Sequence, residues 1–141
     1  LNEVVLTQNR ARGKTFEQMG SVLVESYLRN TENYLGPINI SADKTIFESI
    51  DSKGRQSKRR YDLYLPDFKL GVEIKSGRIS YQKSIKDQIY KDHYLLKRKL
   101  VNDVWWLLFY GASEKVLTEL LGRKINFIDL GFNDFEDEPK G

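Results

Sequence analysis

The most constraining feature of this sequence is the run DVWWLLFY at residues 103–110, which is its most apolar stretch. A short, continuous apolar run is typical of a strand buried on both faces, in the middle of a sheet. Residues 69–75 predict another strand, and a long helix is expected over about 80–100 because Ile85, Ile89, Leu96 and Leu100 fall along one face. These three segments predict a βαβ unit, whose crossover is right-handed if its strands are parallel.

The remaining segments complete an alternating α/β order. The spacing of apolar residues predicts a helix over 15–30, with Thr15 and Gln18 as a capping box at its start. We expect strands at 44–50, 60–65 and 124–130, a short helix at about 113–121, and a polar loop at 51–59. The 141 residues predict one domain, with residues 1–12 as an N-terminal extension and 131–141 as an acidic tail.

Composition excludes several classes of chemistry. The chain has no Cys, so disulfides and Cys-ligated metals are excluded, and its single His93 rules out a multi-histidine metal site. No apolar run approaches the roughly 20 residues of a membrane span. The net charge is +3, with −4 on residues 129–141 and +7 on the rest of the chain. Such a basic body suits a polyanionic partner, although charge runs are also common on solvated surfaces.

The most informative segment is 60–77, because acidic and basic side chains alternate with apolar ones there. In 69–75, Val72 and Ile74 point to one face and Glu73 and Lys75 to the other. If Asp62 lies on the neighbouring strand, its carboxylate and that of Glu73 converge on one cation, which suits Mg²⁺ or Mn²⁺. Lys75 is placed to orient a water or to stabilise charge on a phosphate. The alternative is that Glu73 and Lys75 are exposed neighbours on an edge strand.

Asp62 and Glu73-Ile74-Lys75 resemble the D…(D/E)-x-K core of the PD-(D/E)xK nuclease superfamily. The resemblance implies a restriction-endonuclease-like core, with a central mixed β-sheet flanked by helices on both faces. It also implies a divalent-metal-dependent endonuclease in which Asp62 and Glu73 hold Mg²⁺ or Mn²⁺, with Zn²⁺ possible, and Lys75 is catalytic. The sequence departs from the pattern in one place, since Tyr61 stands where the motif name has proline.

The same resemblance implies further site residues. The opening Gly13-Lys14-Thr15-Phe16-Glu17 is similar to that of resolvase-like members, which points to Glu17 as a third metal ligand and catalytic residue. Glu25 is the competing carboxylate, and the helix dipole alone would also favour an acid at position 17. Gln88, on the helix after E-x-K, is expected to bind phosphate or orient Lys75.

Two further helix positions and the basic loop complete the candidate residues. Asp92 is a weaker alternative to Gln88, or the two form a surface pair, and His93 is expected to face solvent. The basic loop lies just before Asp62 and supplies the expected phosphate contacts, which are Arg59 and Arg60, with Lys58 and Arg55 beside them.

A second resemblance is to the C-terminal toxin domains of bacterial polymorphic toxins, including those of contact-dependent growth inhibition. It implies export within a larger protein, action in the target cell's cytoplasm, and a cognate acidic immunity protein as partner. The substrate would be DNA, slightly favoured, or RNA such as tRNA. The alternatives are a cytoplasmic junction-resolving, repair or restriction nuclease, of the cell or of a phage, a module that binds nucleic acid without cutting it, or an interaction domain whose basic face meets a protein.

Overall fold

The computed structural model describes residues 2–41 and 45–131, with side chains described from residue 13 onward. Most of the predicted acidic tail therefore lies outside the described residues. The elements, in chain order, are α1 (Asn2–Asn30), β1 (Ile46–Ile50), β2 (Gln56–Arg60), β3 (Leu63–Leu65), β4 (Leu70–Lys75), α2 (Lys83–Lys97), β5 (Asp103–Leu108), α3 (Glu114–Gly122) and β6 (Asn126–Asp129).

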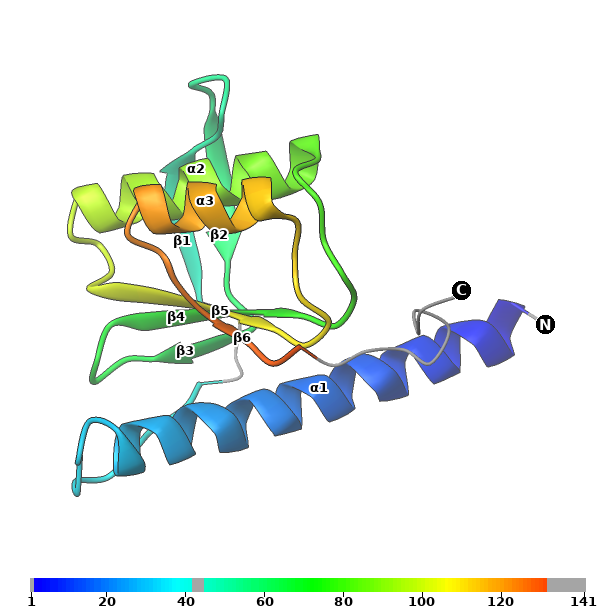
Figure 1. Ribbon diagram of the computed structural model, residues 1–141, viewed down its shortest axis with the longest axis vertical. Coiled ribbons are helices and arrows are strands. Elements are labelled where there is room, and N and C mark those ends of the chain that lie inside the picture. Colours follow the sequence, from blue (N-terminus) through cyan, green and yellow to red (C-terminus); the bar gives the residue numbers. More distant parts are fainter. Residues whose placement is uncertain (1, 42–44, 132–141) are drawn as a thin grey trace.

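The main sheet has four strands in the order β3-β4-β5-β6. β3 pairs antiparallel with β4, whereas β4, β5 and β6 run parallel to one another. In Figure 1, α1 lies across one face of this sheet, and α2 and α3 cover the other. The predicted α/β class, with a mixed sheet and helices on both faces, is confirmed.

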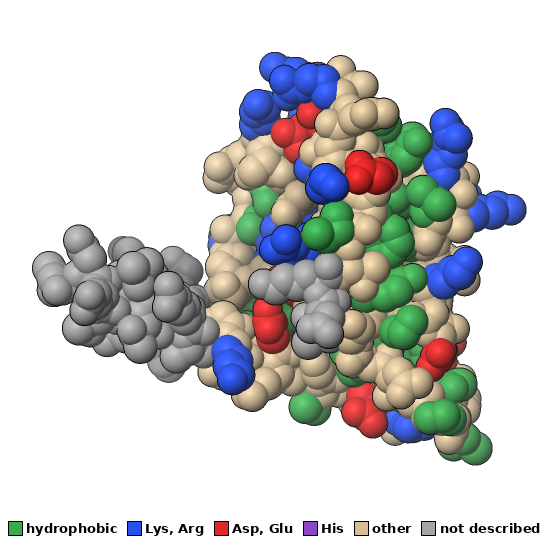
Figure 2. Space-filling model, turned by 180° about the vertical axis from the view of Figure 1, so that it is seen from behind, with side chains coloured by type: hydrophobic (Ala, Val, Ile, Leu, Met, Phe, Trp, Pro, Cys, Tyr) green, Lys and Arg blue, Asp and Glu red, His purple; other side chains and the backbone are tan. Residues whose placement is uncertain are grey.

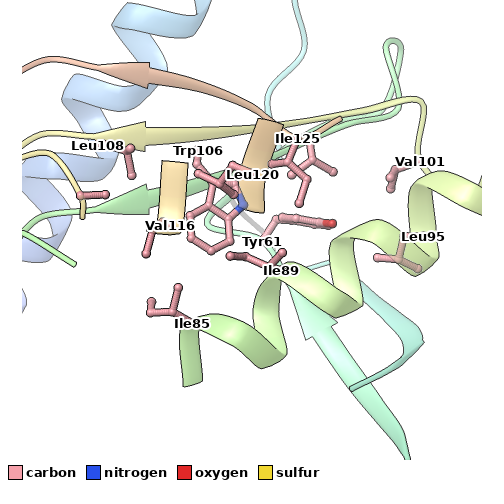
Figure 3. Close-up of a cluster of buried hydrophobic side chains, with 12 residues drawn as sticks. Tyr61, Ile85, Ile89, Leu95, Val101, Trp106, Leu108, Val116, Leu120 and Ile125 are labelled. Carbon is pink, nitrogen blue, oxygen red and sulfur yellow. The ribbon is translucent and has the colours of Figure 1, made fainter. Parts of the chain in front are cut away.

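Strand β5 joins two hydrophobic cores, as its sequence predicts. On the side of α1, Leu107 packs in one cluster with Val72 and Leu28. On the side of α2 and α3, Trp106 packs in the other cluster with Ile89 and other buried residues (Figure 3). Successive residues of a strand point to opposite faces, so this division also places Glu73 and Lys75 on the α2 side of β4.

Helix α1 begins well before the predicted position. The backbone of residues 2–12 is helical and continuous with the rest of α1, so the predicted start at Thr15 is wrong. A capping box is a local signal, and the preceding NEVVLTQNRAR segment has no proline to stop the helix. Gly13 inside the helix costs only about 1 kcal/mol. Among the described residues, none of the helices has the length and apolarity that crossing a membrane requires.

The predicted loop at 51–59 is also wrong, because it contains strand β2. β1 and β2 form an antiparallel hairpin, with Ile46 opposite Arg60 and Ile50 opposite Gln56. At its turn the Asp51 carboxylate accepts the backbone N–H groups of Lys53 and Arg55. The segment QSKRR has no apolar residue to reveal a strand. The one buried side chain of this strand is charged, and the acidic residues that this side chain contacts are distant in sequence.

Candidate active site

Asp62 lies beside Glu73 because the residue is held to β4 on both sides of that glutamate. Its backbone N–H donates to the carbonyl oxygen of Val72 at 3.0 Å. Its carboxylate Oδ2 accepts the backbone N–H of Ile74 at 2.7 Å. Two residues that are eleven positions apart in the sequence thus present neighbouring carboxylates. The predicted strand at 60–65 is wrong, however, because β2 ends at Arg60 and β3 begins at Leu63, so Asp62 lies between two strands.

The environments of these two carboxylates differ. Burial, together with the negative charge of Glu73, raises the pKa of Asp62 to about 6. Burial alone would also raise the pKa of Glu73, but the adjacent Arg59 and Lys75 cations hold it below its ordinary value. Near neutral pH both groups are ionised, and their repulsion favours a bound cation.

Lys75 is held in a fixed position between β4 and α2. Its Nζ lies 2.9 Å from Oε2 of Glu73 and donates a 2.7 Å hydrogen bond to Oε1 of Gln88. The same ammonium lies 5.2 Å from the centre of the Trp106 ring. Gln88 therefore does contact Lys75, which was one of its two expected roles.

Arg59 does not lie where a phosphate contact must be, and this part of the sequence prediction is wrong. The residue is only 3% exposed, and its Nη1 lies 3.0 Å from Oε1 of Glu73. Its Nε and Nη2 donate to the two carboxylate oxygens of Asp92, at 2.7 and 3.0 Å. The basic stretch thus contributes one arginine to the interior, because alternate residues of β2 point inward.

Asp92 is the centre of this buried network, and sequence reasoning underestimated it. The residue is fully buried, and it accepts hydrogen bonds from the Tyr61 hydroxyl at 2.6 Å and from the Trp106 indole at 2.8 Å. Figure 3 shows Tyr61 and Trp106 in the core between the sheet and α2. Tyr61 packs there, whereas Leu63 and Leu65 pack in the core beside α1.

The acidic and basic residues predicted from the sequence fall into two groups. The structure brings together Asp62, Glu73, Lys75 and Gln88. It does not bring Glu17 into a shared cluster with Asp62 and Glu73, since the described residues contain no group of three or more His, Cys, Asp or Glu placed to hold a metal. Glu25 is exposed on α1 and lies 3.9 Å from Arg29.

The other predicted phosphate contacts, Arg55, Lys58 and Arg60, are exposed on the hairpin. Figure 2 shows Lys and Arg side chains gathered at the projecting top of the molecule, where this hairpin turns. His93 is half-buried rather than solvent-facing, and its Nδ1 has no hydrogen-bond partner among the described residues.

The donor set fits a hard divalent cation. Asp62 and Glu73 offer only oxygen atoms, which Mg²⁺ and Mn²⁺ prefer, and a cation between them would offset the repulsion that helps to raise the pKa of Asp62. Oδ1 of Asp62 accepts no hydrogen bond from any residue that the structure describes, whereas both oxygens of Glu73 have cationic partners.

Comparisons of the chain with protein-family models, with curated proteins and with solved structures found no match.

The raised pKa of Asp62 predicts a stability cost that depends on pH. A carboxyl with a higher pKa in the folded state destabilises the fold above that pKa, and the cost disappears as pH falls below the unfolded value. Asp62→Asn is therefore expected to raise the free energy of unfolding by about 1–3 kcal/mol near neutral pH and by almost nothing below about pH 4. Urea unfolding of the metal-free protein across this pH range measures the difference. A gain that does not change with pH would contradict the assigned environment of Asp62.

Proposed function

We propose that this protein is a divalent-metal-dependent nuclease that hydrolyses phosphodiester bonds in nucleic acid. The observation that carries the proposal is the convergence of Asp62, just before β3, with Glu73 and Lys75 of β4 and Gln88 of α2. Two carboxylates beside a fixed ammonium provide the groups needed to bind a cation and to stabilise a phosphate anion. DNA is slightly favoured over RNA as the substrate.

Each residue has a distinct part in the proposed reaction. Asp62 and Glu73 would hold Mg²⁺ or Mn²⁺, which polarises a phosphoryl oxygen and lowers the pKa of a bound water. Lys75 lies between Glu73 and Gln88, and its ammonium stabilises the negative charge that develops on the scissile phosphate. Gln88 fixes the direction of the Lys75 side chain. Glu17 is not needed in this scheme.

The direct test is incubation of the purified chain with plasmid DNA and with total RNA. We expect cleavage with Mg²⁺ or Mn²⁺ and no cleavage in excess EDTA. A parallel reaction contains Zn²⁺ for comparison. Asp62→Asn and Glu73→Gln provide the controls, because both remove a negative charge without changing the side-chain volume greatly. If the protein cuts nucleic acid fully in EDTA, or if both variants cut normally, the proposed site is wrong. Binding without any cleavage would favour the non-catalytic module.

The exposed basic residues of the hairpin predict a salt-dependent contact with the substrate. Arg60→Ala should weaken the binding of all sequences by a similar factor, because phosphate contacts carry no sequence information. The slope of log affinity against log salt concentration should fall by roughly 0.7 to 0.9 for each phosphate that is no longer neutralised. Lys58→Ala should reduce the slope similarly. The exposed ion pair of Lys58 with Glu48 contributes little to binding or stability, so losing this pair should not obscure the effect. Fluorescence anisotropy in the Asp62→Asn background measures this, with Lys14→Ala on α1 as the control, and unchanged slopes would place the nucleic acid elsewhere.

We further propose a biological role as the toxin domain of an interbacterial competition system, with an acidic immunity protein as its inhibitor. A nuclease with little sequence recognition damages the cell that makes it. Expression of the wild-type chain in bacteria should therefore arrest growth, whereas expression of Asp62→Asn should not. Normal growth with recovery of active enzyme would favour a resolving, repair or restriction nuclease.

A further inference from the structure

We propose that Arg59 is a positioning residue that holds Glu73 and takes the place of a second metal ion, so that the site binds one divalent cation. This inference rests on the proposed nuclease function and concerns the same site. Its starting point is the position of a fully charged side chain, 3% exposed, against the carboxylate of Glu73.

The guanidinium of Arg59 is fixed from several directions. Its Nε and Nη2 bond both oxygens of Asp92, while Nη1 reaches Glu73 and also donates to the carbonyl oxygen of Arg60 at 2.9 Å. Its Cζ lies 4.5 Å from the centre of the Tyr61 ring. Asp92, on α2, is itself held by Tyr61 and Trp106. It therefore orients Arg59, and Arg59 in turn orients Glu73.

The two oxygens of Glu73 each face a protein cation. Oε1 lies 3.0 Å from Arg59 and Oε2 lies 2.9 Å from Lys75. A carboxylate has about four lone-pair sites, so Glu73 can still share one with a metal ion. Bridging two metal ions would require it to release a cation, and Arg59 cannot leave without breaking its paired hydrogen bonds to buried Asp92.

The charges of the cluster favour a single divalent cation. Arg59 and Lys75 carry two positive charges, against three negative charges on Asp62, Glu73 and Asp92. One divalent cation and one phosphodiester anion would bring the whole cluster to neutrality. A second divalent cation would leave an excess of two positive charges in a largely buried site, where unpaired charge is costly.

The experiment measures metal stoichiometry and kinetics separately. Titration of the wild-type chain with Mn²⁺, followed by calorimetry and by electron paramagnetic resonance, should give one bound ion per chain. Arg59→Met combined with Asp92→Asn removes one charge of each sign, so the fold is expected to persist. This double variant should lower kcat roughly 10- to 100-fold with KM unchanged, as for residues that orient a metal ligand. Arg98→Met, at the exposed end of α2, should change neither value.

Arg59→Lys provides a second variant if the double variant fails to fold. Lysine keeps the charge but cannot bond both oxygens of Asp92, so kcat should fall while the stoichiometry stays at one. Two Mn²⁺ per wild-type chain, with normal cleavage, would overturn this inference and leave the nuclease proposal standing. An increase in KM with a smaller salt slope would overturn it as well, because Arg59 would then contact substrate. Absence of both Mn²⁺ binding and cleavage would remove the nuclease proposal itself.

Discussion

Replacing Lys75 with methionine is expected to lower kcat for nucleic-acid cleavage by about 10²- to 10⁴-fold, the usual loss when a catalytic proton donor or charge stabiliser is removed. Methionine keeps most of the side-chain length, while the ammonium and its contact with the Trp106 ring are removed. KM should change much less, because a charge that acts mainly in the transition state contributes little to ground-state binding. Steady-state kinetics on a fluorescent substrate with Mg²⁺ separates the two parameters.

The control for this prediction removes the same charge from a surface helix. Lys115 on α3 is exposed and lies 3.8 Å from Glu119, so Lys115→Met should leave kcat unchanged. Gln88→Leu should produce a smaller loss than Lys75→Met, since the ammonium remains but one of its two polar contacts disappears. Equal activity of Lys75→Met and the wild-type protein would show that Lys75 takes no part in the reaction, whatever its contacts.

The sequence predicts the parts of this molecule that depend on local patterns. The apolar run of β5 and the alternation in β4 identify the centre of the sheet and place Glu73 and Lys75 on one face. These predictions hold because a strand's side chains alternate regardless of what packs on them. Asp62 is expected on the strand at 60–65, whereas it lies between β2 and β3 and is held beside Glu73 by its hydrogen bonds to β4.

The buried network could not be predicted in the same way. Arg59 lies in a stretch whose charges indicate a solvated loop, and its burial depends on Asp92, 33 positions later. Nothing local distinguishes Arg59 from Arg60. One available signal was the spacing of Gln88 and Asp92, which places Asp92 one turn after the residue that contacts Lys75. The role of Asp92 can be inferred from this spacing only once β2 is known to be a strand.

The largest effect on stability is expected at Asp92. Asp92→Ala should lower the free energy of unfolding by about 3–5 kcal/mol, because Arg59 would remain buried without its main counter-charge. The hydroxyl of Tyr61 and the indole N–H of Trp106 would lose their acceptor as well. Urea unfolding followed by circular dichroism measures the change. Asp87→Ala on the same helix is the control, since Asp87 is only half-buried and bonds Ser52 near the surface, so its loss should cost about 1 kcal/mol.

A double-mutant cycle separates the two sources from which this effect can arise. If the penalty comes from an uncompensated guanidinium, adding Arg59→Met to Asp92→Ala should restore part of the missing stability, because the buried charge disappears with its partner. If it comes mainly from the unsatisfied hydroxyl and indole groups, the double variant should be no more stable than Asp92→Ala. Removing Arg59 alone leaves both Asp92 and Glu73 without that cation, so the single variant Arg59→Met should also be destabilised. Additive losses for the two substitutions would mean that Arg59 and Asp92 stabilise the fold independently, contrary to their paired hydrogen bonds.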